Sequence, residues 1–165
     1  MKIYNKEKFN ENKEKILTKI KEGNIFIYPT DTIYGIGCDA RNFEAVKRIR
    51  ELKNRDEKPF SVIAPSKEWI IDNCEEKNLD KLPGPYTLIL KLKNKECVAS
   101  NVSGLDTLGV RIPDHWFKVD IPIVTTSVNK SDKNNMTSLE DLDKDIKVDF
   151  IIYEGEKKGK SSKII

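Results

Sequence analysis

Three cations lie close together in the chain: Lys53, Arg55 and Lys58. They follow a segment with helical apolar spacing and precede Pro59, after which an apolar strand is expected. The negative end of a helix favours such cations by about 0.3–1 kcal/mol, so the cluster could be only a solvated helix end. Because it leads directly into a strand, and open α/β sheets bind ligands at strand ends, we also expect it to bind a phosphate group.

A hydroxyl and an amide follow another apolar strand, in the run Ser127-Val128-Asn129. A sharp turn at this place would present both groups at the carboxyl end of the strand, where they could hold phosphate or sugar oxygens. Serine and asparagine at a strand end are also ordinary turn formers, and this alternative stays open.

The most unusual run is PTDTIYG at 29–35. Thr30 and Thr32 point the same way if the backbone is extended, and Gly35 allows the backbone to approach a ligand closely. Asp31 could bind a cation or close the turn through its own side chain, and we favour the turn. This run and the three cations suggest a pocket for a small polar substrate beside a phosphate group.

Two other features are set aside. The run GEKKGKSS at 155–162 looks like a phosphate-binding P-loop, but it has three residues between its glycines instead of four, and the chain ends three residues later. His115 is the single histidine, which excludes a multi-histidine metal site, and we expect it to be structural.

Length and composition limit the domain number and the classes of function that the chain can have. A chain of 165 residues favours one domain, residues 1–165, with one core. The net charge of +3 is too mild to argue for nucleic acid by itself. Cys38, Cys74 and Cys97 have no metal or redox spacing, and no run approaches a membrane span, so we expect reduced thiols in a soluble cytoplasmic protein without membrane contact.

Apolar spacing predicts helices over 8–22, 43–53, 67–74 and 138–146, with Asn42, Ser66 and Ser138 as N-caps and Gly23 as a C-terminal cap. Apolar and alternating runs predict strands over 24–28, 60–64, 86–93, 107–112, 121–126, 149–153 and 161–165. Helices and strands alternate at first and the strands then come closer together. This order predicts a single-domain α/β fold with a mixed parallel and antiparallel sheet and helices on its faces.

Six segments, in order, resemble the YrdC-like family, whose members are threonylcarbamoyl-adenylate synthases. They are PTDTIYG (29–35), KNR with KP (53–59), PGPYTLIL (83–90), TLGVRIPDH (107–115), SVN (127–129) and the closing GKSSKII. The pairing of Lys-x-Arg with Ser-x-Asn is the family's signature. The resemblance implies a twisted mixed sheet bent around a concave, positively charged cavity.

The resemblance also implies a nucleotidyltransferase reaction. L-Threonine, bicarbonate or carbon dioxide, and ATP with Mg²⁺ would give threonylcarbamoyl-adenylate and pyrophosphate. A downstream threonylcarbamoyl transferase complex would then use the product to modify an adenosine of certain tRNAs.

The same resemblance implies roles for individual residues. Lys53 and Arg55 would be catalytic. The ATP-binding set would be Arg55, Lys58, Thr107, Ser127, Asn129 and Asn135. The threonine-binding set would be Thr32, Tyr34, Arg111, Thr125 and Ser161, with Arg111 as a two-pronged partner of the substrate carboxylate.

The chain departs from the family pattern in four places. Ile63 stands where many members carry a histidine, and the run SVNKSD replaces S-A-N-L-S-G. Only five residues separate His115 from Ile121, where a helix is expected, and the chain ends at SSKII without a further arginine. We therefore expect a member of the family with a trimmed C-terminus, or one domain of a longer chain.

Two other functions stay open. One is a module that binds double-stranded RNA or tRNA through the basic cavity with little catalysis, although 8% aromatic residues offer no evident stacking platform. The other is a carbamoyl-transfer enzyme that uses a different acceptor.

Overall fold

One sheet runs through the molecule. The computed structural model describes residues 1–55, 58–129 and 134–165, and in these residues nine strands form one sheet in the order β1-β8-β2-β3-β7-β4-β6-β5-β9. The strands are β1 (Lys2–Tyr4), β2 (Phe26–Tyr28), β3 (Gly35–Gly37), β4 (Ser61–Ile63), β5 (Tyr86–Lys91), β6 (Thr107–Arg111), β7 (Ile123–Ser127), β8 (Phe150–Ile152) and β9 (Lys163–Ile164).

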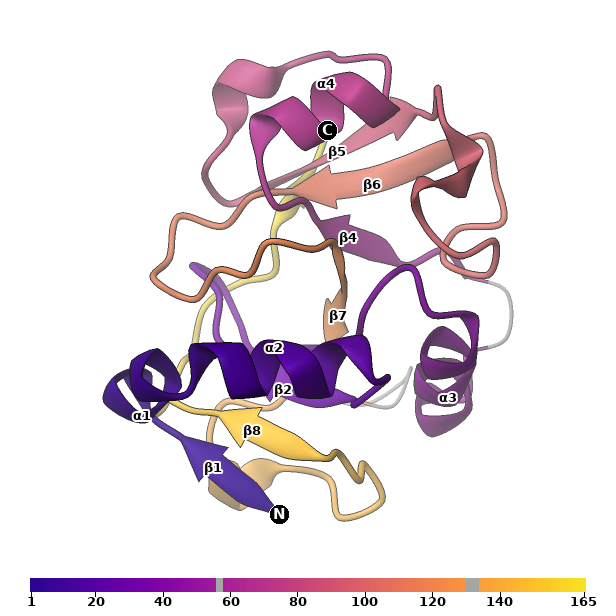
Figure 1. The fold of residues 1–165 in the computed structure, drawn as a ribbon. Helices are drawn as coiled ribbons and strands as arrows, with labels where there is room; N and C mark the ends of the chain where they lie inside the picture. Colours follow the sequence, from indigo (N-terminus) through magenta and orange to yellow (C-terminus); the bar gives the residue numbers. More distant parts are fainter. Residues whose placement is uncertain (56–57, 130–133) are drawn as a thin grey trace.

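The predicted mixture of strand directions is confirmed. The pairs β1/β8, β2/β8, β4/β6 and β5/β9 are parallel. The pairs β2/β3, β3/β7, β4/β7 and β5/β6 are antiparallel. The sheet is strongly twisted, so its two ends face different directions (Figure 1).

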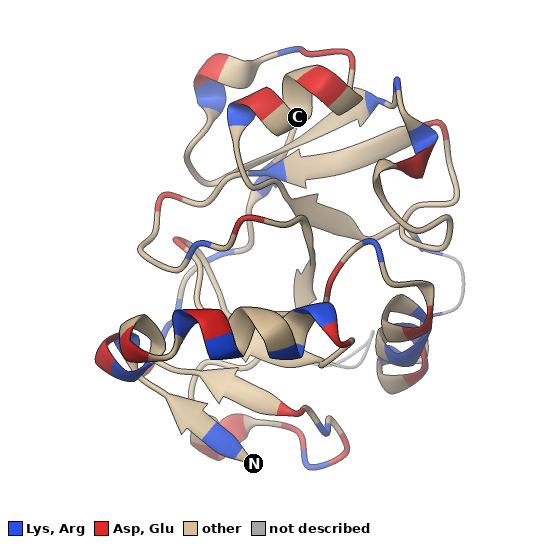
Figure 2. Cartoon of the chain, viewed as in Figure 1, with Lys and Arg blue, Asp and Glu red and all other residues tan. Residues whose placement is uncertain are grey.

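Helices cover both faces. On one face, α1 (Lys6–Glu11) and α2 (Lys13–Lys21) bury Phe9, Ile16 and Ile20 against aromatic side chains of β2 and β8. On the other, α3 (Phe43–Lys53) and α4 (Lys67–Asn73) pack into the larger core with the apolar residues of the central strands. Charges of both signs alternate along these helices, whereas the strands are mostly uncharged (Figure 2).

The strand register divides the α1–α2 face into two halves. On β2, Phe26 and Tyr28 point to this face and pack under the helices. The register carries the same face to Ser127 on β7, Ser61 on β4 and Arg111 on β6. Since alternate residues of a strand share a face, the sheet presents an apolar half under α1 and α2 and a polar half beyond them.

Strand β3 was not predicted, because its sequence Gly-Ile-Gly carries few strand signals. The glycines make room for Tyr28, whose ring would lie 2.9 Å from a Cβ atom added at Gly35 or Gly37. The Tyr28 hydroxyl reaches across the sheet to donate to the Val124 carbonyl at 2.9 Å. Strand β1 was missed as well.

The helix predicted over 8–22 was wrong in its bounds and continuity. It begins earlier and breaks at Asn12, whose backbone N–H donates to Phe9 O and whose side chain donates to Lys8 O at 2.7 Å. Such local side-chain bonds compete with the helix ladder. The predicted cap at Gly23, which has a φ of 100°, agrees with the structure.

The helix predicted over 138–146 was also wrong, because this segment forms only a 3₁₀ turn, η3 (Leu139–Asp141). The Asp141 carboxylate accepts from the backbone N–H groups of Thr137 and Ser138, and the Asp143 carboxylate accepts from Asp145 N. These bonds satisfy the backbone without a helix. Further 3₁₀ turns are η1 (Leu79–Lys81) and η2 (Lys95–Cys97).

Helix α3 begins and ends as predicted, at a side-chain cap and at the cation cluster. The Asn42 side chain accepts from Ala45 N at 3.0 Å, and the helix ends at Asn54 in the left-handed region. Because the Asn42 cap fixes where α3 begins, it also helps to fix the position of Lys53 in the last turn of the helix.

We expect Asn42→Ala to lower the free energy of unfolding by about 1 kcal/mol, because the first turn of α3 loses its side-chain acceptor. Urea denaturation followed by circular dichroism measures the change. Asn10→Ala, at an exposed position of α1, is the matched control and should leave stability unchanged or slightly higher. Equal losses in both variants would show that the Asn42 cap does not matter.

Candidate functional site

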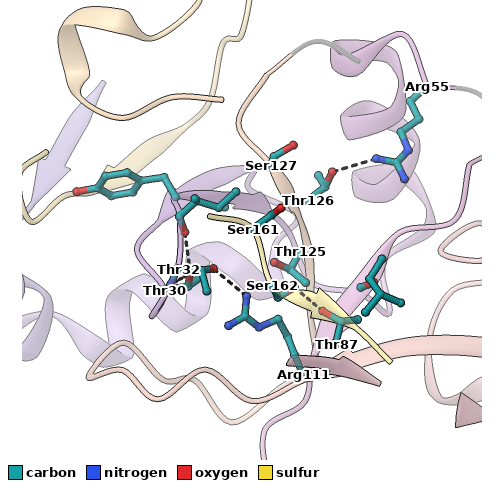
Figure 3. A pocket seen from close by; sticks show the side chains of 15 residues that line it. Thr30, Thr32, Arg55, Thr87, Arg111, Thr125, Thr126, Ser127, Ser161 and Ser162 are labelled. Atoms are coloured by element: carbon teal, nitrogen blue, oxygen red, sulfur yellow. Dashed lines mark hydrogen bonds between the residues drawn. The ribbon is translucent and has the colours of Figure 1, made fainter. Parts of the chain in front are cut away.

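A cavity of about 360 Å³ lies over the polar half of the sheet. It is lined by Thr30, Thr32, Ile33, Tyr34, Gly35, Arg55, Ser61, Thr87, Arg111, Thr125, Thr126, Ser127, Ser161, Ser162 and Ile164. Hydroxyl groups dominate this lining, and the two cations in it are both arginines. Figure 3 shows Arg55 and Arg111 on different sides of the cluster of hydroxyls.

At one end of the cavity, Arg111 is held by the PTDT run. Its Nη2 forms an ion pair with Asp31, and its Nη1 donates to Thr32 Oγ1 at 3.1 Å. The second Asp31 oxygen accepts from Asp114 N at 3.0 Å. Burial lowers the pKa of Arg111, and the Asp31 charge opposes that shift. The prediction that Asp31 closes its own turn was therefore wrong, since it bonds to groups about 80 residues away.

The Thr32 hydroxyl is oriented by its neighbours. Thr30 Oγ1 donates its single proton to Ile33 O at 2.7 Å, so Thr32 is the donor in the 3.1 Å bond between the two hydroxyls. Thr32 Oγ1 also accepts from Arg111. Its remaining lone pair can therefore accept a bond from a ligand, which suits an amine or a hydroxyl.

At the other end, Arg55 contacts oxygen atoms of neutral groups and an aromatic face. Its Nη2 donates to Pro59 O at 2.7 Å, its Nη1 to Thr126 Oγ1 at 3.3 Å, and its guanidinium lies 5.1 Å from the Phe60 ring centroid. Burial lowers its pKa, and the neighbouring charge of Arg50 adds to the effect.

Arg50, which the sequence reasoning missed, organises this end. It is buried and donates to the backbone carbonyls of Arg55 and Lys58 at 3.1 and 2.8 Å. It also donates to Asn101 O and Val102 O. A single buried guanidinium thus holds the two ends of the basic segment against a distant loop.

The Lys-x-Arg and Ser-x-Asn segments meet in space. Lys53 is only 1% exposed, and its Nζ donates to Thr126 Oγ1, Ser127 O and Asn129 Oδ1 at 2.9, 2.6 and 3.1 Å. Ser127 Oγ donates to the same Asn129 oxygen at 2.8 Å. Lys53 therefore lies beneath the cavity lining and holds the turn after β7. Burial, followed by the charge of Arg55, lowers its pKa to about 7.

The C-terminal strap, residues 153–165, contributes Ser161, Ser162 and Ile164 to the lining of the cavity. It runs from β8 to β9 at the far edge, in yellow in Figure 1. The Tyr34 hydroxyl donates to Gly155 O at 2.6 Å and accepts from Glu154 N at 2.9 Å. Gly159 lies so close to the PTDT run that an added Cβ atom would be 2.2 Å from Thr32 O. Further on, Ser162 shares a 2.6 Å hydrogen bond with Thr87.

The residues predicted for the site differ in their position relative to the cavity. The residues that line the cavity are Thr32, Tyr34, Arg55, Arg111, Thr125, Ser127 and Ser161, while Lys53 and Asn129 form the layer below. Lys58, Thr107 and Asn135 do not line it: Lys58 is exposed, and Thr107 and Asn135 are half-buried.

The structure also gives the positions of residues near the site, such as His115 and Ile63. His115 bonds to Glu154 at 2.8 Å and accepts from Phe117 N, which anchors the start of the strap and agrees with the predicted structural role. Ile63 lies beside Arg111 in the register of β4 and β6. Thr87, Ser162 and Arg50 carried no sequence signal. Asp31 was visible, but nothing local pointed to its partner.

Comparison with known proteins gives consistent matches. The family model Sua5/YciO/YrdC, described as "Telomere recombination", matches residues 18–165. A putative threonylcarbamoyl-AMP synthase of Methanocaldococcus jannaschii is 36% identical over 182 residues, covering 100% of this chain and 86% of that one. The threonylcarbamoyl-AMP synthase of Vibrio campbellii is 31% identical over 169 residues, covering 92% of this chain and 90% of that one.

A solved structure agrees. The crystal structure of Pyrococcus abyssi Sua5 complexed with L-threonine matches with a TM-score of 0.85 and 30% identity, covering 99% of this chain. The chain spans 53% of that protein. No helix in the described part of this chain is long and apolar enough to cross a membrane.

The buried Lys53 ammonium predicts a pH-dependent stability. Its folded pKa of about 7 is lower than the ordinary lysine value of 10.5, so between these values the unfolded chain binds more protons. The stability of the wild type relative to Lys53→Met should therefore increase between about pH 7 and about pH 10.5 in urea denaturation. Lys47→Met, at an exposed position of α3, is the control and should show no such trend. A difference that falls as pH rises would contradict the lowered pKa.

Proposed function

The chain belongs to the Sua5/YciO/YrdC family, and on this premise we propose that it is a threonylcarbamoyl-AMP synthase. Its substrates are L-threonine, bicarbonate or carbon dioxide, and ATP, and its products are threonylcarbamoyl-adenylate and pyrophosphate. The observation that carries this proposal is the hydroxyl-rich cavity with one arginine on each side. Such a cavity suits a ligand pair with an amino-acid carboxylate at one end and a polyphosphate at the other.

The reaction needs positioning and charge neutralisation more than a protein nucleophile. The threonine amine attacks the carbon of carbon dioxide and loses a proton, which gives a carbamate. A carbamate oxygen then attacks the α-phosphorus of ATP, and the bond from that phosphorus to the leaving pyrophosphate breaks. A cavity of hydroxyls and fixed cations can hold both reactants in line for these steps.

At the Arg111 end, we assign the amino-acid substrate. Arg111 binds its carboxylate, and the free lone pair of Thr32 accepts from its amine or hydroxyl. Thr125 and Ser161 supply further hydroxyls, and Tyr34 fixes the wall. Burial raises the pKa of Tyr34 to about 12, so its hydroxyl stays protonated and keeps its bond to the strap.

At the Arg55 end, we assign the triphosphate. Arg55 and Ser127 contact it from the lining, while Lys53 and Asn129 fix the turn that presents Ser127. Lys53 is then a positioning residue in the described conformation, and its predicted catalytic role stays a prediction. Lys58, Thr107 and Asn135 lie outside the lining, so their predicted ATP contacts require a nucleotide that extends beyond the cavity.

Magnesium belongs to the nucleotide in this proposal. The described residues contain no group of three or more His, Cys, Asp or Glu side chains that could hold a metal ion. Mg²⁺ commonly binds through substrate phosphates and water, with few protein ligands. It therefore enters with ATP and offsets phosphate charge that Arg55 leaves unpaired.

The product serves tRNA modification through a downstream threonylcarbamoyl transferase complex, as the family resemblance implies. Direct RNA binding is less well supported, because both signs of charge are mixed along α1 to α4 and no basic stripe is visible in that view (Figure 2). Transfer to a different acceptor is tested by offering other amino acids.

Purified protein incubated with ATP, Mg²⁺, bicarbonate and each amino acid in turn should release pyrophosphate with L-threonine only. Mass spectrometry should find the matching adenylate. Release with another amino acid would reassign the substrate. No release from folded protein would contradict the proposed activity of this chain.

Arg55→Ala should raise the KM for ATP by about tenfold to a hundredfold, because a charge-assisted hydrogen bond of about 1.5–3 kcal/mol is lost. The KM for threonine should change much less. Arg48→Ala is the matched control, since Arg48 lies on α3 and pairs with Asp149 away from the cavity. An unchanged KM for ATP in Arg55→Ala would remove Arg55 from the triphosphate site.

A further inference from the structure

We propose that Asp31 makes the cavity directional: by neutralising Arg111 it keeps polyphosphate away from that end and reserves it for the amino acid. This inference deepens the proposed function and rests on it for the identity of the ligands. It gives a selective role to a side chain that does not itself line the cavity.

The first observation is an asymmetry between the two arginines. Arg111 is 4% exposed and forms an ion pair with Asp31, whose side chain is largely buried as well. Arg55 contacts a carbonyl, a hydroxyl and an aromatic ring. Within the described parts of the chain, one guanidinium of the lining is therefore matched by a buried carboxylate, and the other contacts neutral groups.

The second observation concerns the charged side chains that lie near each end of the cavity. Two further basic residues lie close to Arg55: Lys53 shares the Thr126 hydroxyl with it, and Arg50 donates to the Arg55 carbonyl at 3.1 Å. At the opposite end, Asp31 is fixed by Asp114 N and Arg111 by Thr32. Among the described residues, the basic side chains of the site are thus concentrated at the Arg55 end.

The consequence follows from the charges of the ligands. A polyphosphate at Arg111 would face the Asp31 carboxylate, and like charges at such distances disfavour binding. A zwitterionic amino acid brings its own positive charge, so its carboxylate adds no net negative charge beside Asp31. Arg111 still has N–H groups to offer, since each Nη carries two N–H groups and makes one assigned bond.

The test uses pyrophosphate as the probe and calorimetric binding as the readout, so it requires neither turnover nor threonine. Arg55→Ala should lose most pyrophosphate binding. In that background Asp31→Asn removes the carboxylate charge while its amide oxygen can still accept hydrogen bonds. The double variant should regain affinity for pyrophosphate by about tenfold or more, because Arg111 is then unneutralised.

Two matched variants serve as controls for the pyrophosphate-binding experiment. Asp31→Glu in the Arg55→Ala background keeps the charge and should not regain binding. Asp39→Asn in the same background removes the carboxylate partner of Arg41, which lies outside the cavity, and should not regain it either. Failure of Asp31→Asn to regain binding in folded protein would overturn the proposal.

A reciprocal variant covers the case in which Asp31→Asn does not fold. Thr126→Asp places a carboxylate beside Arg55 and Lys53, where the Thr126 hydroxyl contacts both. It should lose pyrophosphate binding by at least about tenfold if local neutralisation decides where the anion binds. Retained binding would contradict the proposal.

Competition between pyrophosphate and L-threonine provides a separate test. In the wild type, pyrophosphate should not compete with L-threonine, whereas in Asp31→Asn it should become competitive. Absence of that change would also overturn the directional role. If the wild type does not bind threonine at all, the proposed function fails, and the pyrophosphate measurements still decide the role of Asp31.

Discussion

The register of the central strands is the constraint on which the rest of the structure depends. Because alternate residues of a strand share a face, the pairing that buries Phe26 and Tyr28 under α1 and α2 also sets Ser127, Ser61 and Arg111 on the continuation of that face. A slip of one residue would exchange the two faces of a strand and place hydroxyls in the core. The same strand register is therefore required both for packing the core and for arranging the residues of the site.

Buried cations are the second recurring element. Arg50, Lys53 and Arg111 are all largely withdrawn from water, and each has several oxygen partners. Removing one partner of a buried charge is costly, whereas a fully bonded cation fixes the geometry around it. Arg50 binds backbone carbonyls, and Lys53 binds one carbonyl, a hydroxyl and an amide oxygen, so both hold loops in place. Arg111 binds a carboxylate and is neutralised as well.

The strap joins the two ends of the sheet across the cavity. It leaves β8, passes Tyr34 and Thr32, and pairs as β9 with β5. Its Glu154 carboxylate also bonds to His115 and its Lys157 N–H donates to Thr137 O, so the strap is held along its length. The lysine-rich run that resembles a P-loop in sequence is part of this strap.

Local patterns were enough to predict α3 with its Asn42 cap, α4 with its Ser66 cap, the apolar strands and the cation cluster, because each depends on neighbouring residues. They failed where polar side chains satisfied the backbone, at Asn12 and Asp141, and where glycines formed a strand beneath Tyr28. The sequence by itself determined which residue types were available for phosphate and carboxylate binding. Only the tertiary structure decided that Arg55 faces the cavity, that Lys53 lies beneath it and that Asp31 neutralises Arg111, because strand order brings together groups about 80 residues apart.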